Sequence, residues 1–128
     1  KARSIFMKIQ SFEDIKSWQK ARNITTQIYK ITSTGKFSRD YGLRNQIQQA
    51  SVSTMANIAE GFGANSNQEF TKFLNYSRRS ATEVQSHLYV ALDQEYITKK
   101  QFNKLYKNLT NLKKLINGFI KYLDNSRD

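Results

Sequence analysis

The chain contains no cysteine and no proline among its 128 residues, and only five glycines and one histidine. The lack of cysteine excludes disulfides and thiolate metal sites. Scarce glycine and absent proline favour long, uninterrupted helices with short connections. No apolar run approaches the roughly 18 residues that a membrane span needs, and the first residues lack the apolar segment of a signal peptide. We therefore expect a cytoplasmic protein with no membrane partner.

Acidic residues are also few. Lysine and arginine number 21 against 10 for aspartate and glutamate, which gives a formal net charge of +11. A charge of this size on a small domain favours a polyanionic partner such as RNA or DNA. The alternative interpretation is that the lysines only keep the protein soluble, and composition alone leaves both open.

Apolar residues recur at helical spacing in four segments, residues 15–31, 43–59, 70–92 and 102–123. Four such segments with short connections predict an all-α fold, an antiparallel up-down-up-down four-helix bundle over residues 7–123. Residues 1–6 are expected to be vector-derived or upstream sequence, and residues 124–128 a C-terminal tail.

Polar residues mark where the helices should begin. Ser11 is expected to cap the first helix. Ser66 with Glu69, and Thr98 with Gln101, have the spacing of capping boxes before the third and fourth helices. The second segment is rich in small residues, which let helices approach closely, so it should be the most enclosed. Its small residues are Ala50, Ser51, Ser53, Ala56, Ala59 and Gly61.

The sequence has little catalytic potential. His87 is the only histidine, so neither a catalytic triad nor a histidine metal site is indicated. Glu60 and Glu83 lie within helical segments, where a buried carboxylate would have to be paired, with Arg78 or Arg79 for example. We interpret them as parts of a structural polar network within or between subunits, and the alternative is a general acid or base. We predict a protein that is not an enzyme and has no metal or cofactor. The proposed network comprises Gln46, Asn57, Glu60 and Glu83.

Basic residues concentrate in the fourth helical segment, which has no acid between Lys99 and Lys121. Lysines near the start of a helix oppose its dipole, so this charge should serve something besides helix stability. Tyrosines 89, 96, 106 and 122 lie among them and could stack on bases. The alternative is a solvated lysine face with tyrosines at the core margin. The candidate nucleic-acid-binding residues are Arg78, Arg79, Lys99, Lys100, Lys104, Lys107, Lys113, Lys114 and Lys121.

The run Asn57-Ile-Ala-Glu-Gly61, followed by Ser66-x-x-Glu69-Phe70, resembles the four-helix-bundle proteins of the 23S rRNA intervening-sequence family. The similarity begins with Met7 to Ala21 and extends over residues 7–123. One departure is Phe37-Ser38, where the family usually has Phe-Pro, and this change affects the entry to the second helix.

The resemblance implies a barrel-shaped homopentamer whose biochemical activity is not established. It also implies a relationship to the accessory variability proteins of diversity-generating retroelements, which bind nucleic acid and a reverse transcriptase. The prediction is thus a basic, non-enzymatic homopentamer that binds nucleic acid, as an accessory to an enzyme such as a reverse transcriptase. The alternative is a protein-interaction scaffold that binds no nucleic acid.

Overall fold

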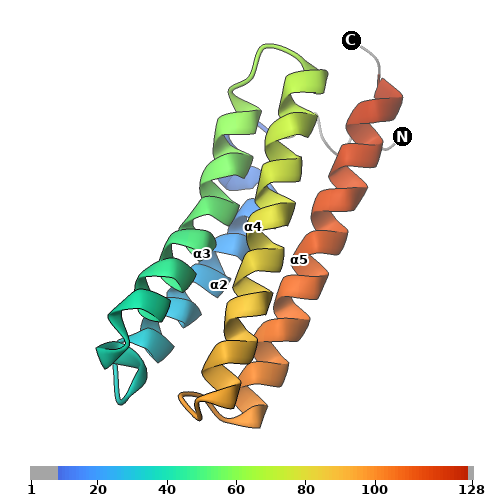
Figure 1. The fold of residues 1–128 in the computed structure, drawn as a ribbon. Coiled ribbons are helices and arrows are strands. Elements are labelled where there is room, and N and C mark those ends of the chain that lie inside the picture. Colours follow the sequence, from blue (N-terminus) through green and yellow to red (C-terminus); the bar gives the residue numbers. More distant parts are fainter. Residues whose placement is uncertain (1–8, 127–128) are drawn as a thin grey trace.

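The computed structural model describes residues 9–126, and this part of the chain forms four long helices and no strand (Figure 1). The all-α four-helix bundle is therefore confirmed. The expected extra residues 1–6 lie outside the described range. The last helix continues to Ser126, past the point where a tail was predicted. The elements are η1 (Phe12–Asp14), α2 (Lys16–Thr32), η2 (Phe37–Arg39), α3 (Tyr41–Phe62), α4 (Asn67–Asp93) and α5 (Lys99–Ser126).

The helices pack around one apolar core. The α3–α4 contact is the most extensive, α4–α5 and α2–α3 follow, and α2–α5 is the smallest of the four. None of the helices in the described part of the chain has the length and hydropathy that a bilayer span requires. Each predicted apolar stripe supplies core residues. In α5 the buried residues are Phe102, Leu105, Leu109, Leu112, Ile116, Phe119 and Leu123.

Of the two predicted capping boxes, the one at Thr98 is complete, whereas in the one at Ser66 the Glu69 carboxylate accepts from the Asn65 N–H, at 3.5 Å, and not from the Ser66 N–H. The Ser66 hydroxyl accepts a hydrogen bond from the Glu69 backbone N–H at 3.1 Å. Thr98 and Gln101 form the reciprocal pair, at 3.1 Å from the Gln101 N–H to Thr98 Oγ1 and 2.8 Å from the Thr98 N–H to Gln101 Oε1. These bonds satisfy N–H groups that have no partner inside the helix, and they fix the starts of α4 and α5.

The start of the first helix differs from the prediction. Ser11 precedes the short η1 turn, where the Asp14 carboxylate accepts from the Gln10 and Ser11 N–H groups at 3.0 and 3.3 Å. Ile15 is then extended, with φ −78° and ψ 122°, and α2 begins only at Lys16. The break allows the Ile15 side chain to enter the core, where it is 2% exposed.

Helix α3 is enclosed by its neighbours, as its small residues predicted. Gly61 is buried, and a Cβ atom added to it would lie 2.6 Å from Phe70 Cδ1 and 2.9 Å from Phe73 Cβ. Distances below 3.0 Å lie well inside the 3.5–4.0 Å at which carbon atoms attract each other. Only glycine therefore allows α3 and α4 to approach this closely.

Buried polar side chains connect successive helices. Buried hydroxyl and amide groups need hydrogen-bond partners, and three of them find one on a backbone carbonyl of the adjacent helix. Each successive pair of long helices is joined in this way. The bonds are Thr25 Oγ1 to the Ser51 carbonyl at 3.0 Å, Ser77 Oγ to the Thr54 carbonyl at 2.6 Å, and Gln85 Nε2 to the Tyr106 carbonyl at 3.2 Å.

Asp40 joins two connections at one end of the bundle. One carboxylate oxygen caps α3 by accepting from the Leu43 N–H at 3.1 Å, and the other accepts from the Tyr96 hydroxyl at 2.9 Å. The bond to Asp40 raises the pKa of Tyr96 above its ordinary value of 10.0, because the neutral phenol is the donor. Phe37, 1% exposed, packs against the Tyr96 ring with centroids 5.2 Å apart.

Candidate nucleic-acid interface

Four lysines of α5 form a row along its exposed side. Lys100, Lys107, Lys114 and Lys121 are all exposed and are seven residues apart. Seven residues are close to two helical turns, so successive Cα atoms are about 10.5 Å apart along the axis and drift only slightly around it. We call these four residues the lysine row. The prediction that α5 presents a basic face to solvent is consistent with their exposure.

The other predicted basic residues of α5 lie beside this row. Lys99 and Lys104 are exposed, whereas Lys113 is half-buried at the boundary with α4. Between residues 9 and 126 no lysine or arginine lies within ion-pairing distance of an acid, and the one contact of a basic ring with a carboxylate is His87 Nε2 to Glu83 Oε2, at 3.3 Å. The lysines and arginines of this range therefore have no acidic partner within it, and their charges remain available to an external anion.

Arg78, Arg79 and Lys113 meet in a groove between α4 and α5. Thr82 and Asn117 complete its lining, and its volume is about 330 Å³. We call these five residues the basic groove. Three of its five lining residues are cationic and none is acidic, so its field favours an anion such as phosphate.

Hydrogen bonds hold two of the cations of the basic groove in place. Arg78 Nη1 donates to Asn117 Oδ1 at 3.0 Å, and Lys113 Nζ donates to Thr82 Oγ1 at 3.2 Å. Both acceptors are neutral, so the side chains are oriented while their charges stay uncompensated. Both cations retain further N–H groups that could donate to a ligand.

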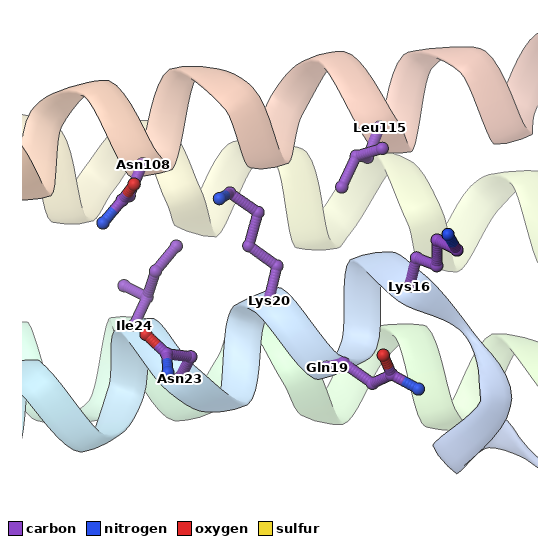
Figure 2. Close-up of a pocket in the computed structure, with 7 residues that line it drawn as sticks. All are labelled: Lys16, Gln19, Lys20, Asn23, Ile24, Asn108 and Leu115. Atoms are coloured by element: carbon purple, nitrogen blue, oxygen red, sulfur yellow. The ribbon is translucent and has the colours of Figure 1, made fainter.

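A second groove, which the sequence did not indicate, separates α2 from α5. Its volume is about 440 Å³ and it too has no acidic lining residue. Figure 2 shows Lys20 extending from α2 toward α5, while Asn108 points back from α5. The one sequence signal that could have indicated this groove is the pair Lys16 and Lys20, one turn apart with no acid between them. The lining residues are Lys16, Gln19, Lys20, Asn23, Ile24, Asn108 and Leu115.

The predicted tyrosines have different environments. Tyr89 is 50% exposed, and Tyr106 and Tyr122 are half-buried. The hydroxyl of Tyr96 is occupied by Asp40, so that residue is structural.

The predicted polar network is not assembled within one chain. Glu60 is exposed, which corrects the expectation of a buried acid, because its position in the helix faces away from the core. Asn57 donates to the Ser53 carbonyl and hydroxyl, both at 2.9 Å, and Glu83 pairs with His87. Gln46 is exposed. A network between subunits stays a prediction.

Side chains suited to a metal ion are not gathered in the described part of the chain, where no group of three or more histidine or acidic residues occurs. The side chain of His87 is 16% exposed and its described partner is the single carboxylate of Glu83. The charged side chains that line the two grooves are therefore all cationic, and they belong to α4, α5 and α2.

The sequence profile of the 23S rRNA-intervening sequence proteins matches residues 13–118. The chain belongs to this family. A solved structure with the same fold is a protein of unknown function from the S23 ribosomal protein family of Bacteroides thetaiotaomicron. That structure shares 25% sequence identity and has a TM-score of 0.76, and the alignment covers 82% of this chain and 95% of the other. No curated protein matches the chain.

Membership of the intervening sequence protein family confirms the resemblance carried by the Asn57–Gly61 run. The matched region includes the whole basic groove and three lysines of the lysine row, and it ends before Lys121. Both grooves therefore lie within the matched region.

Proposed function

We propose that this intervening sequence protein is a non-enzymatic module that binds RNA or DNA through phosphate contacts. The observation that carries the proposal is the convergence of Arg78, Arg79 and Lys113 on a groove without an acid. Arginine and lysine donors held by neutral partners suit phosphate oxygens, and such contacts position a nucleic acid without reading its sequence. The lysine row adds four exposed cations on the same helix, over a length comparable to several nucleotides.

The salt dependence of binding tests this proposal. Fluorescence anisotropy with generic RNA and DNA oligonucleotides should detect binding at about 50 mM salt. If about six phosphates are contacted, the association constant should fall about 10³-fold by 200 mM, because bound cations are released when the protein binds. Binding that is absent at low salt, or that does not respond to salt, would contradict phosphate recognition.

We also propose that four helices run up-down-up-down and that five subunits assemble in a ring. The short connections 63–66 and 94–98 support the first point, since each joins two helices that pack along their lengths. Exposed apolar residues support the second, because a ring needs two different contact surfaces on each subunit. Residues of this kind include Tyr41, Val52, Tyr76, Val90 and Leu115.

The molar mass of the assembly tests the number of subunits. Light scattering coupled to size exclusion should give a mass near five times the 14.9 kDa of one chain. A ring of that size would carry five times the charge of +11, which would concentrate polyanions around it at low salt. A monomer at micromolar concentration would refute the pentamer while leaving the groove of each chain intact.

A protein partner is the remaining part of the proposal. We infer that the bound nucleic acid is presented to a nucleic-acid enzyme such as a reverse transcriptase. The support is that exposed apolar residues such as Val52 of α3 and Tyr76 of α4 lie outside the basic groove and the lysine row, where a protein partner could pack. The alternative is a scaffold that binds no nucleic acid. It would be favoured if the protein shows no salt-dependent oligonucleotide binding and a pull-down still recovers one protein partner after nuclease treatment.

A further inference from the structure

An aromatic cluster lies where α4 and α5 meet. The ring of Tyr89 in α4 packs against Phe102 and Tyr106 of α5, with centroid distances of 4.8 and 5.8 Å. Phe102 and Tyr106 stack on each other at 5.4 Å. Phe102 is buried and Tyr106 half-buried, whereas Tyr89 is 50% exposed. Tyr89 is thus an exposed ring held in one orientation by the two rings behind it.

The cluster and the basic groove belong to one line of contacts between α4 and α5. Each contact pairs a residue of α4 with a residue of α5, and the spacing along both helices is four, three and four residues. The pairs are Arg78–Asn117, Thr82–Lys113, Gln85–Thr110 and Tyr89–Tyr106. We call this line the α4–α5 seam.

The geometry of the α4–α5 seam places an aromatic ring close to the cations. Tyr89 is seven residues from Thr82, and Tyr106 is seven residues from Lys113, so each offset is about 10.5 Å along its helix. Positions 78, 82 and 89 fall on the same flank of α4, because their spacing of four and seven residues follows the helical repeat. A bound chain could therefore reach the ring and the cations together.

The hydroxyl of Tyr89 does not oppose an anionic ligand. The charge of the neighbouring Tyr106 phenol, followed by burial and a hydrogen bond to that phenol, raises the pKa of Tyr89 above its ordinary value of 10.0. The ring is therefore neutral at physiological pH. It adds stacking surface without adding negative charge beside the phosphates.

An exposed aromatic ring beside cations favours single-stranded over double-stranded nucleic acid. A duplex keeps the faces of its bases stacked on one another, so an exposed tyrosine gains little from it. A single strand offers free base faces beside its phosphates, and proteins that bind single strands combine a basic track with aromatic platforms. We infer that the α4–α5 seam binds single-stranded nucleic acid, with phosphates held by Arg78 and Lys113 and a base stacked on Tyr89. The inference rests on the proposed function and specifies its substrate class.

The test compares a single-stranded 12-mer with the same sequence as a duplex, by anisotropy at about 50 mM salt. The unmodified protein should prefer the single strand. Tyr89→Ala should weaken single-strand binding about tenfold, the loss of one base–aromatic stack, and leave the salt slope and duplex binding unchanged. Tyr89→Phe should bind as the unmodified protein does. Tyr29→Ala, which removes a ring of similar exposure from α2, should also have no effect.

The outcomes separate this inference from the proposed function. Equal affinity for single strand and duplex, with no effect of Tyr89→Ala, overturns the single-strand inference while salt-sensitive binding upholds phosphate recognition. No binding of any oligonucleotide overturns both. A Tyr89→Ala variant whose mass by light scattering differs from that of the unmodified protein assigns the ring to a subunit contact, and this too overturns the inference. Circular dichroism establishes that each variant is folded.

Discussion

Replacing Arg78, Arg79 and Lys113 together with glutamine should weaken nucleic-acid binding about 100-fold at 50 mM salt. Glutamine keeps much of each side chain's length and polarity but removes three charges that have no acidic partner in the basic groove. Each lost phosphate contact should also lower the slope of log K against log salt by about 1, so the slope should fall by about 3. Anisotropy titrations at several salt concentrations measure both quantities.

The matched control removes the same charge elsewhere. Lys30, Lys36 and Arg39 are exposed at the α2–α3 connection, and their replacement by glutamine changes the net charge from +11 to +8 as well. If the basic groove holds the ligand, this control should keep most of its affinity. Equal losses in the two triple variants would mean that binding depends on total charge and not on the groove.

Gly61→Ala should destabilise the fold by about 2 kcal/mol, although alanine is the better helix former. The exchange in an exposed helix normally gains up to about 1 kcal/mol. Here the new methyl group would overlap Phe70 and Phe73, and Phe73 Cβ is fixed to the α4 backbone, so α3 and α4 must move apart. Overpacking of this kind costs about 1–3 kcal/mol and outweighs the gain in propensity. Urea unfolding followed by circular dichroism gives the change in free energy.

Gly118 supplies the control for that experiment. It is an exposed glycine within α5, and an added Cβ would have no neighbour within 4 Å. Gly118→Ala should therefore stabilise the protein by up to about 1 kcal/mol. All variants are compared at one protein concentration, because stability depends on concentration if subunits associate. A stabilised Gly61→Ala variant would contradict the close approach of α3 and α4.

The sequence predicted the helices well because local rules determine them. The apolar stripe of α5 and the caps at Ser66 and Thr98 depend on spacing within a few residues, and the structure confirms them. Phe37 and Ile97 were not predicted as core residues. Both lie in connections, where no periodicity indicates which way a side chain points, yet they are 1% and 6% exposed.

The candidate site was predictable only in part. The lysine row is visible in the sequence because its members share one helix. The basic groove and the α4–α5 seam depend on which residue of α4 lies opposite which residue of α5, and that register is a tertiary property. Glu60 was misplaced for a related reason. The small residues around it indicated enclosure of the helix, but each helix has a side that its neighbours leave open.

The buried bonds between successive helices also bear on how the bundle can move. Sliding α3 by one turn past α2 would shift it about 5.4 Å and leave the Thr25 hydroxyl without the Ser51 carbonyl. The same holds at the α3–α4 and α4–α5 contacts. Among the described residues no side-chain hydrogen bond crosses from α2 to α5, where the packing is also smallest. Side-chain hydrogen bonds thus join three of the four pairs of adjacent helices. Separation of the fourth pair, α2 and α5, requires the least rearrangement.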